Sequence, residues 1–289
     1  MHSIIVALKN WIRTLRFSQP AVSDKSMDLG LKNKVSLVAA SSKGLGRAVA
    51  EELAAEGSSL ILCARDARVL DQTCDEINKE TGADVLAVTA DLTDLKQVKN
   101  LVESGLGKFG HIDILVTNSG GPPAGRFDQL TLEQWEEAVR LTLFSTTELV
   151  REVLPGMRAR RWGRILNITS IAVKQPVENL ILSNSLRAAV TGFARTLAHE
   201  VAAEGITVNN ILPGYTCTER LEELAGMMAK KQGISVTEFK SRWEGEIPMG
   251  RLGEPREFAA VAAFLVSERA SYITGTSVQV DGGWIKSLF

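Results

Sequence analysis

One stretch of the sequence, VSLVAASSKGLGRAVAEELAAEG at residues 35–57, decides the fold. Its first part, residues 35–40, is short and apolar, as a buried strand is. Its last part, residues 47–57, repeats apolar residues at helical spacing and ends in a glycine suited to stop a helix. Residues 41–46 between them form a tight turn with two glycines. Such a unit directs free backbone N–H groups and a helix N-terminus at one point, which suits a phosphate.

The turn is an incomplete dinucleotide-binding motif. Ala40 stands where the first glycine of that motif would lie. Because a Gly-x-Gly pair after a strand also occurs in turns that bind nothing, the rest of the chain has to decide between a ligand site and a structural turn.

Composition narrows the class of protein. The chain has 289 residues, 45% of them hydrophobic, enough for a large core in one α/β domain or two small ones. The net charge of −1 gives no global attraction to nucleic acid or to a membrane, and no apolar run reaches the roughly 18 residues of a spanning helix. Three cysteines without Cys-x-x-Cys spacing and three scattered histidines predict no disulfide framework and no metal site. This usage fits a reducing compartment, so we expect a cytoplasmic protein.

Residues 1–26 stand apart from the rest. Residues 1–23 contain basic but no acidic side chains, and their apolar residues fall on one helical face. That pattern suits a targeting or membrane-surface helix, but it also suits a poorly ordered extension upstream of a fresh start at Met27. We favour the extension and expect the folded domain to span residues 27–289.

Beyond residue 57, short apolar segments alternate regularly with helical patterns. The apolar segments are residues 59–63, 84–88, 112–116, 163–168, 206–212 and 276–283, the last with its turn. The alternation predicts a doubly wound, Rossmann-type α/β fold: one domain with a parallel sheet of about seven strands and helices on both faces. Ligands of such sheets bind at the carboxyl ends of the strands. Those ends carry Ser42, Arg65, Asp91, Asn118, Ser170 and Pro213-Gly214.

Several motifs follow one another in a characteristic order. They are residues 39–46, 91–93, 118–120, 163–170, 210–214, 250–255 and 280–283. Over about residues 31–285 the chain resembles the short-chain dehydrogenase/reductase family, and in particular its 3-oxoacyl carrier-protein reductase branch. The resemblance implies a nicotinamide cofactor, hydride transfer at a carbonyl or alcohol carbon, and a homotetramer or homodimer.

The resemblance also implies an active site of Asn, Ser and a Tyr-x-x-x-Lys pair, from which this chain departs. Ser170 matches the serine, but Ser183 replaces the tyrosine, Arg187 the lysine and Thr142 the asparagine. A serine is a far weaker acid than a phenol of pKa about 10, whereas arginine keeps its charge and its planar donors. Our hypothesis is that Ser170, Ser183 and Arg187 form a modified proton relay and oxyanion site. The alternatives are that Ser170 only caps a strand end, that Arg187 pairs with an acid, and that Tyr215 supplies a displaced phenol.

The cofactor would lie along the glycine turn and the neighbouring strand ends. By the resemblance, its contacts are Ala40, Ser42, Lys43, Gly44, Leu45, Gly46, Arg65, Asp91, Leu92, Asn118, Ser119, Gly120, Pro213 and Gly214. An NAD site needs an acid at the end of the second strand, where this chain has Arg65. Lys43 and Arg47 add two cations near the glycines, so we expect NADP. NAD stays the alternative because Asp66 lies about 20 residues past Gly46, the usual spacing of that acid.

By the same resemblance, residues 216–248 form a substrate lid. Their apolar residues at helical spacing suit either an apolar substrate or plain packing. The sequence therefore favours an NADP-dependent reductase of a small-molecule carbonyl, a 3-oxoacyl or other ketone substrate, with no nucleic-acid or membrane partner. The alternative is a catalytically weak or silent member that binds NADP(H) or acts as a scaffold. A nucleotide-sugar epimerase ranks low, because it would need the first glycine, the Tyr-Lys pair and a larger C-terminal domain.

Overall fold

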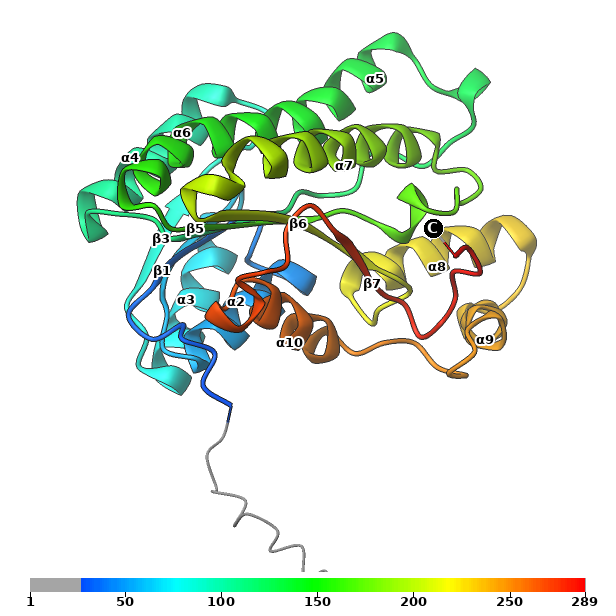
Figure 1. Ribbon diagram of the computed structural model, residues 1–289. Coiled ribbons are helices and arrows are strands. Elements are labelled where there is room, and N and C mark those ends of the chain that lie inside the picture. The colour runs from blue at the N-terminus through cyan, green and yellow to red at the C-terminus, as the bar shows by residue number, and fades with distance from the viewer. Residues whose placement is uncertain (1–26, 289) are drawn as a thin grey trace, which may run out of the picture.

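The computed structural model describes residues 27–288, and its centre is a seven-stranded sheet (Figure 1). The strand order is β3-β2-β1-β4-β5-β6-β7, and every neighbouring pair is parallel. The bounds are Val35–Val38 for β1, Ser59–Ala64 for β2, Val85–Thr89 for β3, Ile114–Thr117 for β4, Gly163–Ile168 for β5, Ile206–Pro213 for β6 and Ser277–Val280 for β7. The predicted doubly wound fold is confirmed. The extension predicted for residues 1–26 lies outside the described residues.

Alternation of side chains explains why the sheet is covered on both faces. On β2, Leu60 and Leu62 belong to one core cluster, whereas Ile61 and Cys63 belong to another. Successive side chains of a strand point to opposite faces, so a strand that is apolar throughout needs an apolar layer on each side.

Helices supply those two layers (Figure 1). One face carries α2 (Gly44–Ala55), α3 (Ala67–Thr81) and α10 (Pro255–Leu265). The other carries α4 (Leu95–Phe109), α6 (Ser145–Arg160) and α7 (Ile181–Val201), with α5 (Leu132–Val139) packed against α7. No helix within residues 27–288 is both long and apolar enough to cross a membrane.

Two helical segments are interrupted. A π-helical turn, η2 (Arg140–Phe144), separates α5 from α6. Residues 219–246 contain two helices, α8 (Glu219–Gln232) and α9 (Val236–Glu246). The break follows from Gly233, which ends α8 in a left-handed conformation, and from Ser235, whose hydroxyl caps α9.

Candidate active site

The sheet reverses its strand order at β1, which pairs with β2 on one side and with β4 on the other. Such a switch point opens a crevice at the carboxyl ends of the strands. Here the crevice is spanned by one hydrogen bond, because Asn118 Nδ2, just after β4, donates to the Ala40 carbonyl oxygen, just after β1, over 3.0 Å. Two of the predicted cofactor residues are thereby brought together.

The glycine turn fits a dinucleotide despite its missing first glycine. Gly44 has φ +56°, and a Cβ on Gly46 would lie 2.4 Å from the Ala40 carbonyl oxygen and 2.8 Å from Asn118 Nδ2. Ala40 itself adopts φ +47°, a left-handed conformation that costs an alanine about 1 kcal/mol. The loop therefore keeps a glycine-type conformation at Ala40, and the close approach of helix and strand that the motif requires is intact.

The glycine turn is tied to the end of β2. Ser41 N donates to the Cys63 carbonyl oxygen over 2.9 Å, and Cys63 N donates to Ser41 Oγ over 3.2 Å. Lys43, on the turn, and Arg65, after β2, therefore belong to two segments that are joined at their bases. Arg65 is exposed and has no polar partner among residues 27–288. In a dinucleotide site this is where the adenosine ribose lies.

Two other charges named in the sequence analysis are engaged elsewhere. The Arg47 guanidinium pairs with Glu51 at 2.7 Å and with Glu76 at 2.9 Å. The Asp66 carboxylate accepts a hydrogen bond from Val69 N over 3.1 Å and so caps α3. Arg65 and Lys43, the latter in an exposed ion pair with Glu219, are the other cations near a ribose phosphate, and the carboxylate that would have suited NAD caps a helix.

The remaining predicted cofactor residues lie along the same edge. Asp91 Oδ1 accepts from Thr93 N over 2.9 Å and from Thr93 Oγ1 over 2.8 Å, which shapes the turn after β3. Gly214 N donates to the Val280 carbonyl oxygen over 2.9 Å, so the end of β6 is held against β7. Ser42, Leu45, Leu92, Ser119, Gly120 and Pro213 lie in or beside the same strand-end turns.

Arg187 is the best-anchored group of the predicted catalytic set. Its Nη1 donates to the carbonyl oxygens of Ile168 and Thr169, each over 2.9 Å, and its Nε donates to Ser183 Oγ over 3.2 Å. Arg187 and Ser183 are four residues apart on α7, so they share one helix face. Within residues 27–288 no carboxylate pairs with Arg187, so the alternative of an ordinary surface ion pair does not describe it.

Burial lowers the pKa of Arg187 to about 10, which still leaves the guanidinium charged at neutral pH. A half-buried cation held only by carbonyl oxygens and a hydroxyl is well placed to stabilise negative charge that develops nearby. Ser170 directly follows the carbonyl of Thr169, which Arg187 holds. Its Oγ accepts from Ala172 N over 3.1 Å, so Ser170 does cap a turn, but the hydroxyl hydrogen stays available to a substrate oxygen.

Thr142 lies in the π-turn η2, which contacts α7. Two hydroxyls donate to backbone carbonyl oxygens of this segment, Ser145 Oγ to that of Leu141 and Thr146 Oγ1 to that of Thr142. Thr142 is 3% exposed, and its own Oγ1 has no hydrogen-bond partner in the described part of the chain. An unpaired buried hydroxyl costs about 1–3 kcal/mol, and π-turns are frequent at functional sites. Thr142 forms no hydrogen bond with the other three predicted catalytic residues.

Tyr215 is a poor substitute for the missing phenol. Its ring stacks on Trp243 at a centroid distance of 4.8 Å and meets the edge of Trp284 at 5.6 Å. Burial and, to a smaller extent, the charge of Glu246 raise the pKa of Tyr215 to about 12. A phenol of that pKa, packed against Trp243 and Trp284, is a weak proton donor at neutral pH.

Two hydrogen bonds that the sequence did not predict position the segment leading into α7. Gly125 N donates to the Asn179 carbonyl oxygen over 2.7 Å, which joins the loop after β4 to the segment before α7. Asn184 Nδ2 donates to the Val177 carbonyl oxygen over 2.9 Å. Asn184 follows Ser183 directly. A polar residue inside an apolar helical pattern was the sequence feature that could have indicated this contact.

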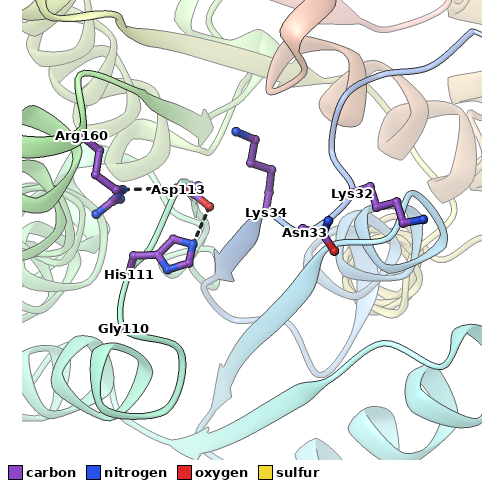
Figure 2. Close-up of a pocket in the computed structure, with 7 residues that line it drawn as sticks. All are labelled: Lys32, Asn33, Lys34, Gly110, His111, Asp113 and Arg160. Atoms are coloured by element: carbon purple, nitrogen blue, oxygen red, sulfur yellow. Dashed lines mark ion pairs between the residues drawn. The ribbon is translucent and has the colours of Figure 1, made fainter.

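A broad cavity of about 640 Å³ lies elsewhere, at the amino ends of β1 and β4 (Figure 2). It is lined by Lys32, Asn33, Lys34, Gly110, His111, Asp113 and Arg160. Buried Asp113 accepts from Val35 N over 3.0 Å, and it meets His111 Nε2 at 3.1 Å and Arg160 Nε at 3.5 Å. These contacts tie the amino ends of two strands to α6. None of the predicted site residues borders this cavity, which we interpret as structural.

Comparison with known proteins identifies the family. The family described as Enoyl-(Acyl carrier protein) reductase matches residues 39–285. Curated relatives include the 3-oxoacyl-[acyl-carrier-protein] reductase of Aquifex aeolicus, 34% identical over 89% of this chain and 99% of the relative. The chain belongs to the short-chain dehydrogenase/reductase family.

Solved structures of other members of this oxidoreductase family are also similar. L-sorbose reductase from Gluconobacter frateurii, complexed with NADPH and L-sorbose, is 35% identical, with a TM-score of 0.87 over 91% of this chain and 100% of that one. A 7α-hydroxysteroid dehydrogenase complexed with NADH and 7-oxo glycochenodeoxycholic acid is 30% identical, with a TM-score of 0.81 over 91% of this chain and 98% of that one. Both nicotinamide cofactors therefore occur among the structural neighbours.

Proposed function

We propose that the protein is an NADP(H)-dependent oxidoreductase that reduces the carbonyl of a small-molecule substrate, a 3-oxoacyl thioester or another ketone, with an altered active site. The observation that carries the proposal is the hydrogen bond from Arg187 Nε to Ser183 Oγ, made by a guanidinium that the end of β5 holds beside Ser170. Reduction of a carbonyl develops negative charge on its oxygen. A fixed cation beside two hydroxyls can stabilise that charge and supply a proton to it.

The proton and charge path can be written with these groups. A dihydronicotinamide cofactor held along Ala40, Gly44, Gly46 and Asn118 would supply a hydride for the carbonyl carbon, and negative charge would then develop on the carbonyl oxygen. The Ser170 hydroxyl donates a hydrogen bond to that oxygen. The Ser183 hydroxyl transfers its proton to the same oxygen, and Arg187 Nε stabilises the negative charge left on Ser183 Oγ. Water then returns a proton to Ser183, so that the enzyme is regenerated and the product is the alcohol.

Ser183 should donate its proton more slowly than the tyrosine that it replaces. General acid–base catalysis contributes about 10²–10⁴ in rate, and a serine retains only part of that factor. Thr142, with its unpaired buried hydroxyl, is the fourth residue that we assign to the site, where it can order a water beside α7.

We favour NADP over NAD because of the residues after β1 and β2. A 2′-phosphate is an anion, and Lys43 and Arg65 are the two cations on the joined segments where the ribose would lie. The NADPH complex of L-sorbose reductase supports the same choice. The cofactor would also contact the edge formed by Ala40, Gly44, Gly46 and Asn118.

Two further features complete the proposal. Residues 216–248 act as the substrate lid, which α8 and α9 form with an apolar cluster around Phe239 and Trp243. The protein is also a homo-oligomer, a dimer or a tetramer. In support, Phe127 in the short 3-10 helix η1 (Phe127–Gln129), Leu132 in α5 and Phe144 in η2 are 72%, 70% and 46% exposed, which is apolar surface that a second copy would bury.

The test combines cofactor titration with a turnover assay. NADPH binding is followed by fluorescence, and absorbance at the nicotinamide band is followed with a panel of 3-oxoacyl thioesters and ketones. Ser170→Ala should lower kcat by about 10²-fold or more and leave the NADPH Kd within twofold. Ser185→Ala, an exposed position on α7, is the matched control and should change neither.

Two outcomes would contradict the proposal. Tight NADPH binding without turnover of any substrate would favour the silent, cofactor-binding alternative, which the loss of the tyrosine already suggests. Absence of NADPH and NADH binding would mean that the turn at Ala40 is a structural one.

A further inference from the structure

The lid touches the glycine turn through an ion pair. Lys43 Nζ, at the N-cap of α2, lies 3.0 Å from Glu219 Oε2, on the first residue of α8. The neighbouring residues are also close, because a Cβ built on Gly44 would lie 3.7 Å from Thr218 Cγ2. The first turn of the lid is thus seated on the turn that we assign to the cofactor.

The ion pair between Lys43 and Glu219 costs little to break. The Lys43 and Glu219 side chains are 56% and 66% exposed, and exposed pairs are weak. Within the described part of the chain, each is the other's one ion-pair partner. The Lys43 ammonium can therefore pass from the carboxylate to a stronger anion at little cost.

Lys43 is also the cation that a 2′-phosphate would meet. Its turn is fastened to α3, because Thr73 Oγ1 donates to the Ser42 carbonyl oxygen over 3.1 Å, and to the end of β2 through Ser41. A phosphate held there brings a charge of about −2 to the ammonium that already faces Glu219. The two anions then compete for one cation, so Glu219 acts on the phosphate through Lys43. NADH, which carries no 2′-phosphate, leaves the pair undisturbed.

We propose that Glu219 is a specificity-determining residue that acts from the lid, where it neutralises Lys43 and so weakens the binding of NADPH relative to NADH. This inference rests on the proposed function. The structural role of Glu219 is separate: a carboxylate in the first turn of α8 stabilises that helix through its dipole, without distinction between the two cofactors.

The experiment measures the Kd of NADPH and of NADH by fluorescence titration on the full chain. Glu219→Gln should tighten NADPH by about two- to fivefold, the range expected for an exposed pair, and leave NADH unchanged. The gain should shrink at high salt, because both charges are exposed. Glu223→Gln is the matched control. It removes the same charge from the same helix, but Glu223 pairs with Arg220, at 3.6 Å, and so NADPH should bind as in the unmodified protein.

A double-mutant cycle isolates the pair. Lys43→Gln should weaken NADPH, and in that background Glu219→Gln should have no further effect on the NADPH to NADH ratio. The inference is overturned if Glu219→Gln leaves NADPH unchanged or weakens it, or if Glu223→Gln tightens NADPH equally, which would be a general charge effect. Failure of the unmodified protein to bind either cofactor would instead overturn the proposed function, and the inference with it.

Discussion

Gly46→Ala should damage the protein at one point of the cofactor cradle. Gly46 belongs to α2, where alanine is normally better than glycine by about 1 kcal/mol. The new Cβ would lie 2.4 Å from the Ala40 carbonyl oxygen, whereas real Cβ contacts keep at least 3.0 Å. That carbonyl cannot retreat freely, because it also accepts from Asn118 Nδ2. Overpacking of this kind costs about 1–3 kcal/mol, so after the gain in helix propensity the net loss of stability should be at most about 2 kcal/mol.

Thermal unfolding and NADPH titration measure the two consequences. At about 2–4 °C per kcal/mol, the Tm should fall by at most about 8 °C, and the shifted loop should weaken NADPH at least tenfold. Gly107→Ala is the control. It makes the same change in α4, where a Cβ would have no neighbour within 4 Å, and it should raise the Tm by about 2 °C. If both variants shift the Tm in the same direction, the contact at Gly46 does not limit the cradle and our reasoning is refuted.

Two further predictions concern backbone strain and cysteine reactivity. Ala40→Gly removes the cost of φ +47° but adds freedom to the unfolded chain, so we expect a net gain of about 0.5 kcal/mol in thermal unfolding; a lower Tm would show that Ala40 is unstrained. Burial raises the pKa of Cys63 and of Cys74 to about 11, so both stay protonated thiols below that pH. A disulfide reagent at pH 8 should therefore modify partly exposed Cys217 first in the native protein, and rapid modification of Cys63 would contradict the buried position of β2.

The architecture of the domain could be predicted from the sequence alone. Apolar segments of strand length that alternate with helical patterns admit few arrangements, because parallel strands need long crossovers and bury both faces. The motif order then placed Ser42, Arg65, Asn118 and Ser170 at one edge, where the strand ends have to meet. Local sequence was less informative about interruptions, and no sequence signal predicted the π-turn at residues 140–144. Ser145 and Thr146 donate to carbonyl oxygens four residues earlier, which is a pattern that also occurs in continuous helices.

Tertiary structure decided which of the candidate charges are available. The sequence offered Lys43, Arg47 and Arg65 in favour of NADP and Asp66 as counter-evidence, but contacts from α2 and α3 engage Arg47 and Asp66. The pairing of Lys43 with Glu219 joins segments about 175 residues apart, and no local pattern encodes such a pair. The sequence by itself therefore determined the fold and the edge that carries the site, because hydrophobic periodicity is a local property. The partners of each charged group were decided only by the packed structure, because electrostatic contacts depend on distances between segments that folding brings together.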